Sequence, residues 1–176
     1  MTTLDAYNIY MQLGLSSDKA KLAASQSAFE TMYNGKTWSS PVFLQNNNTG
    51  GIMYINKSFQ KNATQGSPYP RAEWSNPNTP AYYAKFNTIQ DSFIDHIRIT
   101  YKALMKSNTP IEYANNLKAQ GYYTGNAGDY AKNINFVYNI LASNIEKKKP
   151  NNMMASANLL IKVIAVGLII TTLFKR

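Results

Sequence analysis

The sequence predicts a mostly helical α+β fold: helices that carry a small β-hairpin, followed by a hydrophobic helix at the C-terminus. Apolar residues recur at helical spacing, between capping residues, before residue 33 and after residue 88. The stretch between them holds β-forming residues around a run rich in Pro, Gly, Asn and Ser, which is typical of two strands and their connection. Residues 153–174 are almost entirely apolar. With 176 residues, the chain can form one sizeable core.

Two helices are expected first. A short helix around Asp5–Leu13 should stop near Gly14. The next should start with Ser16 or Ser17 as its cap and run to about Met32.

The middle of the chain should form a loop and then a hairpin. Residues Asn34–Gly51 are rich in Asn, Ser, Thr, Gly and Pro, which predicts a loop. The segment Ile52–Phe59 has partial alternation and β-formers, so we expect a strand there. After an irregular tip, Gln65–Pro80, the segment Ala81–Phe86 should return as the second strand.

Three helices should follow the hairpin. The helix over residues 109–120 is marked by Thr109 as the cap, Pro110 at the first position, Glu112 completing a capping box, and Gly121 as the stop. A final helix should cover residues 129–149 and end at Pro150. The helix over residues 88–105 should turn one broad apolar face to the core, made of Ile89, Phe93, Ile94, Ile97, Tyr101 and Leu104.

Composition excludes several kinds of site. The chain has no Cys and one His, which excludes disulfides, thiol catalysis and a Cys/His zinc site, and we expect no cofactor. The net charge of +9 is unevenly placed: residues 1–146 hold 12 Lys and Arg and all 9 acids, whereas residues 147–176 are basic without an acid. A nucleic-acid-binding body should carry its own basic face, so no nucleic-acid partner is expected. A basic tail favours anionic lipid head groups.

The tail predicts a membrane anchor. Met153–Phe174 has the length of a spanning helix, although Lys162 lies inside it. We expect a domain over residues 1–146, a linker over 147–152 and one transmembrane helix over 153–174. No signal peptide is recognised. The alternative is a hydrophobic helix that docks in a partner protein, and basic residues at both ends leave the orientation open.

Two carboxylates stand out. Glu30 lies near the end of a predicted helix among apolar neighbours, and both features disfavour its charged form. Glu73 lies in the predicted hairpin beside Trp74. A pair of acids across a groove lined by Tyr and Trp would be a glycosidase arrangement, whereas an exposed helix carboxylate is the ordinary alternative. The other acids fit helix starts or polar helix faces: Asp5, Asp18, Asp91, Asp95, Glu112, Asp129 and Glu146.

The order of five motifs resembles the glucosaminidase family of peptidoglycan hydrolases, which includes flagellar-rod hydrolases and autolysins. "LAASQSAFETMYNG" places Glu30 on the family's catalytic acid, and "NNTGGI" matches its loop. "AEWSNPNTPAYYAKF" places Glu73 on its hairpin glutamate. "DSFIDHIRI" and "GYYTGNAGDYAKNI" complete the order, with Tyr122 on the functional tyrosine and Tyr130 in the closing "YA". The resemblance covers about residues 14–140.

The resemblance implies a lysozyme-like domain that cuts peptidoglycan between N-acetylglucosamine and N-acetylmuramic acid. Glu30 would be the general acid. Glu73 would activate water or stabilise the transition state, and Tyr122 would orient or stabilise the 2-acetamido group of the sugar. Substrate contacts would come from Asn47, Asn48, Trp74 and Tyr123.

Other readings stay open at this point. The specificity could be that of a muramidase or lytic transglycosylase. The protein could instead be a non-catalytic peptidoglycan-binding or structural membrane protein, or an assembly protein. A lipid-containing phage, with the enzyme in its internal membrane beside other virion proteins, fits the size and anchor, and a bacterial wall enzyme is the other setting. We expect His96 to make a structural hydrogen bond rather than to act as a base or ligand.

Overall fold

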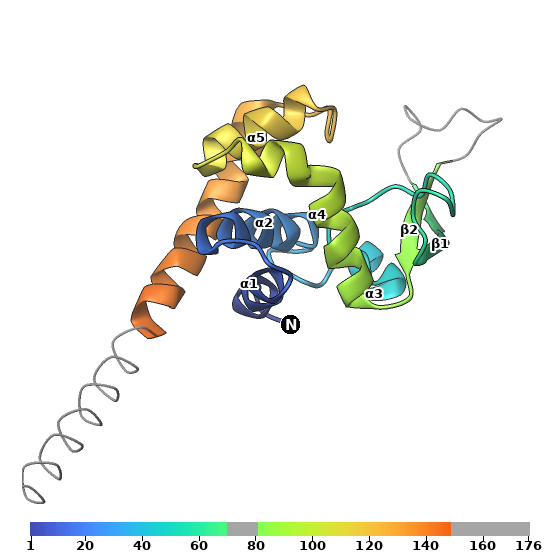
Figure 1. The fold of residues 1–176 in the computed structure, drawn as a ribbon, viewed down its shortest axis with the longest axis horizontal. Coiled ribbons are helices and arrows are strands. Elements are labelled where there is room, and N and C mark those ends of the chain that lie inside the picture. The colour runs from blue at the N-terminus through green and yellow to red at the C-terminus, as the bar shows by residue number, and fades with distance from the viewer. Residues whose placement is uncertain (70–80, 149–176) are drawn as a thin grey trace, which may run out of the picture. The chain divides into compact units, whose positions relative to one another are not determined.

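The computed structural model describes residues 1–69 and 81–148, and residues 1–141 form one compact unit (Figure 1). Its described part is mostly helical with one antiparallel two-stranded hairpin, which confirms the predicted α+β, mostly α class. The predicted tail helix over 153–174 lies outside the described residues, as do Glu73 and Trp74. Among the residues that are described, no helix combines the length and hydropathy that a membrane span requires.

Helices α1 (Thr3–Gln12) and α2 (Ser17–Glu30) confirm the two predicted N-terminal helices. Gly14, with φ +94°, makes the turn between them. Helix α2 packs against α1 and α4 and is buried along most of its length (Figure 1). Its many Ala and Ser side chains are small, so neighbouring helices can approach closely.

A short helix, α3 (Pro41–Asn46), interrupts the region that was predicted to be a loop throughout. The Ser40 hydroxyl caps it by accepting a hydrogen bond from the Phe43 amide, and Pro41 starts it. Six residues with few buried side chains are too short to show helical periodicity, which is why the pattern was missed.

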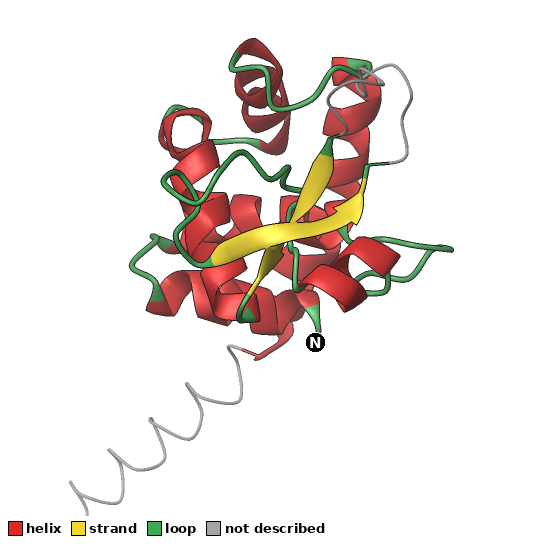
Figure 2. Ribbon diagram, turned by 90° about the vertical axis from the view of Figure 1, so that its right-hand side faces the viewer, coloured by secondary structure: helices red, strands yellow, loops and turns green. Residues whose placement is uncertain are grey.

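The hairpin pairs β1 (Ala63–Pro68) with β2 (Tyr82–Phe86), yellow in Figure 2, with Ala63 opposite Phe86. The returning strand was predicted correctly, but the first strand was not: Ile52–Phe59 forms only an isolated bridge between Met53 and Tyr83. The Asn56 side chain accepts a hydrogen bond from the Phe59 amide, so the chain turns instead of extending.

Helix α4 (Ile89–Met105) confirms the predicted helix and starts at a capping box of Thr88 and Asp91, but its buried face was predicted wrongly in part. Ile94 is 47% exposed and Tyr101 is 56% exposed. Four of the buried side chains are polar, and hydrogen bonds offset the cost of burying them. The buried set is Ser92, Phe93, Asp95, His96, Thr100, Ala103 and Leu104.

Helix α5 (Pro110–Ala119) and a helix from residue 127 to the end of the unit at 141 complete the fold, and residues 142–148 of the second unit are helical too. Thr109 caps α5 as predicted. The predicted capping box is incomplete, because the Glu112 carboxylate accepts from the amide of Asn108 rather than from that of Thr109. The largest fully buried apolar side chains of the core are Tyr10, Leu22, Phe93, Leu104, Tyr113, Leu117, Ile134 and Leu141.

Candidate active site

Glu30 is the last residue of α2, and the chain after it is tied back to the helix end. The Thr31 hydroxyl donates to the Ser27 carbonyl at 2.8 Å, which satisfies one of the terminal carbonyls of the helix. The Thr31 carbonyl accepts from the amides of Ser39 and Ser40, both at 3.0 Å. The half-buried Glu30 side chain is therefore mounted on a fixed helix end.

Tyr130 donates a hydrogen bond to Glu30 from the helix that starts at residue 127. Its hydroxyl lies 2.5 Å from Glu30 Oε1. The ring of Tyr130 is buried between Phe29, which meets it edge-on at 5.3 Å, and Tyr123, which stacks on it at 3.8 Å. These contacts hold the hydroxyl in place against the carboxylate.

The second side of the site is the loop Asn48–Gly51, and Asn48 organises it. The Asn48 amide group donates to the carbonyls of Ile52 and Ala84 at 2.8 and 2.9 Å. Its side-chain oxygen accepts from the amides of Gly50 and Ile52. The side chain is fully buried and shapes the loop, and the substrate contact that was predicted for Asn48 stays a prediction.

Asn47 also serves the fold, because its side chain donates to the Phe86 carbonyl at 3.1 Å and its backbone, at φ +50°, ends α3.

The glycines of this loop allow the backbone to approach the carboxylate closely. A Cβ atom on Gly50 would lie 2.7 Å from His96 Cδ2 and 3.0 Å from the Tyr122 hydroxyl. On Gly51, which has φ +61°, it would lie 3.3 Å from Glu30 Oε2. The Tyr122 hydroxyl donates to the Gly50 carbonyl at 2.5 Å. Glu30, Tyr122 and the glycine loop, predicted from separate motifs, thus come together.

Three tyrosines share the electrostatic field of Glu30. Burial raises the pKa values of Tyr113, Tyr122 and Tyr130, and the negative charge of Glu30 raises each of them further. These phenols therefore stay protonated throughout the neutral range and act as hydrogen-bond donors rather than as bases.

His96 lies behind the loop and confirms the structural role that was predicted for it. It is fully buried, and both ring nitrogens are hydrogen-bonded, Nδ1 with the Tyr10 hydroxyl at 2.5 Å and Nε2 with Gln26 Oε1 at 3.0 Å. Burial lowers the pKa of His96 to about 3, so the ring is neutral at pH 7.

Asp95 differs from its predicted place on a polar helix face. It is 7% exposed, forms an ion pair with Arg98 and accepts from the Gln60 side chain at 3.2 Å. Gln60 in turn binds the backbone of Met53 and Ile55, so Asp95 anchors the segment before the hairpin to α4.

One more predicted residue, Tyr123, has a defined place in the structure. The Tyr123 hydroxyl donates to the Ala114 carbonyl at 3.0 Å, and one face of the Tyr123 ring is covered by Tyr130. The role in substrate binding that was predicted for Tyr123 stays a prediction.

No group of three or more His, Asp or Glu side chains that could hold a metal ion gathers within residues 1–69 and 81–148.

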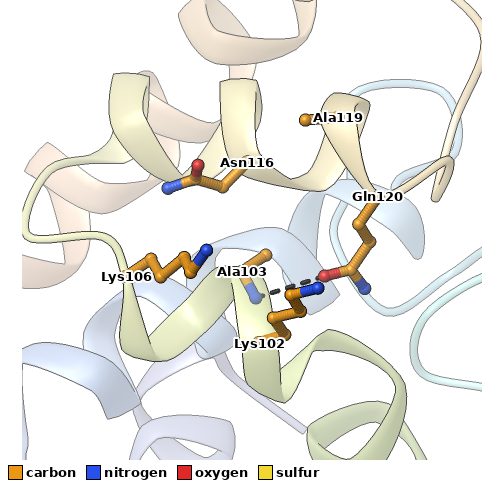
Figure 3. Close-up of a pocket in the computed structure, with 6 residues that line it drawn as sticks. All are labelled: Lys102, Ala103, Lys106, Asn116, Ala119 and Gln120. Carbon is orange, nitrogen blue, oxygen red and sulfur yellow. Dashed lines mark hydrogen bonds between the residues drawn. The ribbon is translucent and has the colours of Figure 1, made fainter.

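A separate hollow of about 200 Å³ lies between α4 and α5 and shares no lining residue with the surroundings of Glu30 (Figure 3). Lys102 and Lys106 line it from α4, and Asn116 and Gln120 from the α5 side. Gln120 is occupied in holding the two segments together, since it accepts from the Ala103 amide and donates to the Ile99 carbonyl.

Comparisons with known proteins give a likeness of fold. The sequence matches no protein-family model and no curated protein. A solved structure of a type VI secretion system effector–immunity complex from Pseudomonas protegens contains a chain with a similar fold, at a TM-score of 0.51 and 22% identity. The match covers 78% of this chain and 86% of that one.

Proposed function

We propose that this protein is a glycoside hydrolase of lysozyme-like fold that cleaves peptidoglycan between N-acetylglucosamine and N-acetylmuramic acid. The observation that carries the proposal is the environment of Glu30: a half-buried carboxyl on a fixed helix end, with a phenol on one oxygen and a glycine backbone beside the other. A general acid needs this kind of fixed orientation toward the oxygen that it protonates.

Each proposed residue has one task in the reaction. Glu30 gives a proton to the glycosidic oxygen as the bond to the sugar carbon breaks, and the bond electrons leave with that oxygen. Glu73 then activates water or stabilises the positive charge that develops on the sugar ring. Tyr122, a protonated donor at the glycine loop, orients the 2-acetamido group of the sugar.

The motif order in the sequence supports this proposal, and so does the fold. The similar chain comes from a secretion effector–immunity complex, whose title names no reaction, so that similarity supports the fold alone. The apolar, basic-flanked segment over 153–174 supports a membrane anchor. We therefore place the enzyme in a membrane, with the internal membrane of a lipid-containing phage as the setting that best fits a small wall-cutting enzyme.

The test compares peptidoglycan cleavage by the parent chain, Glu30→Gln and a matched control, Glu112→Gln. Glu112 is exposed at the start of α5, so the same change there should leave cleavage intact. Purified peptidoglycan is digested, and the released fragments are analysed by mass spectrometry, which identifies the sugar at the new reducing end.

We expect fragments from the parent and from Glu112→Gln but none from Glu30→Gln. Equal release by the Glu30 variant would remove Glu30 from the mechanism. Binding to peptidoglycan without release by the parent would make the protein a binding module instead. N-acetylglucosamine at the reducing ends released by Glu30-dependent cleavage would identify a glucosaminidase as proposed, and N-acetylmuramic acid would identify a muramidase.

A further inference from the structure

Behind Glu30 lies a chain of buried hydrogen bonds that reaches from Tyr130 to α1. The Gln26 side-chain amide, on α2 one turn before Glu30, is its centre. Gln26 Nε2 donates to the Tyr130 hydroxyl at 3.2 Å. Gln26 Oε1 accepts from the Tyr113 hydroxyl at 2.5 Å and faces His96 Nε2 at 3.0 Å. Gln26, Tyr113 and His96 are all fully buried.

The donor in each of these bonds follows from Gln26. An amide oxygen can only accept, so His96 must carry its proton on Nε2. A neutral imidazole with a proton on Nε2 has a bare Nδ1, which therefore accepts from the Tyr10 hydroxyl at 2.5 Å. Ser27 also lies 3.4 Å from Nδ1, but the Tyr10 hydroxyl is much nearer, so Tyr10 gives its one proton to Nδ1 and Ser27 donates to Tyr10 across their 2.6 Å contact. Every donor and acceptor along this side is matched.

The same reasoning on the other side of Gln26 fixes the bond to Glu30. Tyr130 accepts from Gln26 Nε2, so its one proton is free to point at Glu30 Oε1, 2.5 Å away. Only one proton can lie between the Tyr130 hydroxyl oxygen and Glu30 Oε1. Because Tyr130 supplies that proton, Oε1 does not donate to Tyr130. In a protonated carboxyl the carbonyl oxygen is the stronger acceptor, so the bond from Tyr130 favours Oε1 as the carbonyl oxygen and places the proton on Oε2.

We propose that Tyr130 is a positioning residue for Glu30: it reserves Oε1 as an acceptor, so that the proton for the glycosidic oxygen is carried on Oε2, the oxygen beside Gly51. This inference rests on the proposed function. When the proton leaves Oε2 and the glycosidic bond breaks, Glu30 becomes a carboxylate, and the bond from Tyr130 to Oε1 strengthens because its acceptor is now charged. Tyr130 thus stabilises the acid after it has given up its proton.

The ionisable groups around Glu30 keep one charge state near neutral pH, so they do not mask its titration. Three phenols feel its charge: Tyr130 from the last helix, Tyr122 from the segment after α5, and Tyr113 from α5. All three phenols keep their protons, since their pKa values are raised. His96 on α4 is neutral, and Asp95 on the same helix is paired with Arg98.

The orientation of the Gln26 amide decides whether removing the Tyr130 hydroxyl raises or lowers the pKa of Glu30. In the opposite orientation the amide nitrogen would face Tyr113 and His96, and Tyr130 would donate to Gln26. Glu30 would then have to donate to Tyr130, which would favour the protonated carboxyl instead of the charged one. The two arrangements therefore predict opposite effects of removing the Tyr130 hydroxyl.

The experiment measures the titration of the Glu30 carboxyl carbon by ¹³C NMR in the full-length parent, in Tyr130→Phe and in Tyr7→Phe. Tyr7 is the matched control, because its hydroxyl bonds the Ser17 hydroxyl at an exposed position on α1. We expect Tyr130→Phe to move the Glu30 midpoint up by about one pH unit, since a hydrogen bond to a charged group is lost. Tyr7→Phe should leave the midpoint unchanged.

An unchanged or lowered midpoint in Tyr130→Phe would overturn the proposal, and a lowered one would identify the opposite amide orientation. A second measurement needs no variant: the ¹⁵N shifts of His96, the single His of the chain, should report a proton on Nε2 and a bare Nδ1. A proton on Nδ1 would refute the assigned directions even if Tyr130→Phe failed to fold.

Activity separates this inference from the function on which it rests. If Glu30→Gln abolishes cleavage, the alkaline limb of kcat/KM against pH should shift upward in Tyr130→Phe together with the NMR midpoint. If Glu30→Gln cleaves like the parent, the proposed function fails, whereas the NMR titration still decides whether Tyr130 donates to Oε1.

Discussion

The buried imidazole of His96 makes the stability of this protein depend on pH. Burial lowers the pKa of His96 to about 3 in the folded chain, from an ordinary value of 6.5. The unfolded chain therefore binds a proton below pH 6.5 that the folded chain does not accept. The stability from this group is fully present above pH 6.5 and is lost as the pH falls toward 3.

The size of the effect follows from the two pKa values. Once the unfolded His is fully protonated, the free energy of unfolding falls by about 1.4 kcal/mol per pH unit. Between pH 7 and pH 5 the expected loss is about 2 kcal/mol, because the first half unit contributes little. A typical domain has only about 5–15 kcal/mol in total, so the loss is readily measured.

The assay is urea denaturation of the full-length chain at pH 7, 6 and 5, followed by circular dichroism, for the parent and for His96→Gln. The chain has a single His, so the variant removes the only imidazole. A glutamine amide can still donate and accept hydrogen bonds. The variant should be less stable at pH 7 but should lose much less stability on acidification than the parent. An equal decline in both proteins would show that His96 is not the group responsible, and no decline in the parent would refute its buried, neutral state.

Three further changes test the parts that hold the site. Asn48→Ala should destabilise the protein by about 3 kcal/mol or more, because it leaves several buried backbone groups unpaired, and a lower urea midpoint would report this. Gly50→Ala places a methyl group 2.7 Å from His96 Cδ2 and should cost about 1–3 kcal/mol, with a changed His96 NMR signal. Lys19→Met removes a donor to the carbonyls of Met105 and Ser107 at the end of α4, and should lower thermal stability by about 1 kcal/mol without altering the Glu30 titration.

Local sequence rules located most of the helices because their ends are encoded by neighbouring residues. Thr88 and Asp91 form a reciprocal capping box within four residues, and Thr109 with Pro110 starts α5 in the same local way. Gly14 and Gly121 adopt positive φ where helices were expected to stop. These features depend on no distant part of the chain, so the pattern was sufficient.

The buried polar side chains could not be located in this way. The hydrogen-bond partners of His96 on α1 and α2 lie 86 and 70 residues away in the sequence. An apolar periodicity assigns such residues to the outside of a helix, which is how Asp95 came to be placed on a polar face and Ile94 in the core. The four hydrogen bonds of the Asn48 side chain could not be predicted either, because one of their partners, the Ala84 carbonyl, lies 36 residues away in the sequence.

The position of Glu30 at the C-terminal end of α2 is explained by the same distant contacts. A carboxylate there opposes the helix dipole, at a cost of about 0.3–1 kcal/mol. A hydrogen bond to a charged group contributes about 1.5–3 kcal/mol, so the bond from Tyr130 offsets that cost. An acid of purely structural use would not require this arrangement, because Lys or Gln at position 30 would avoid the cost altogether. Around Glu30 the chain also keeps two glycines, a neutral buried His and a matched set of donors, which together fix the direction of one hydrogen bond. The general acid role that we propose for Glu30 requires such preorganisation, because the carboxyl must lose and regain its proton in one orientation.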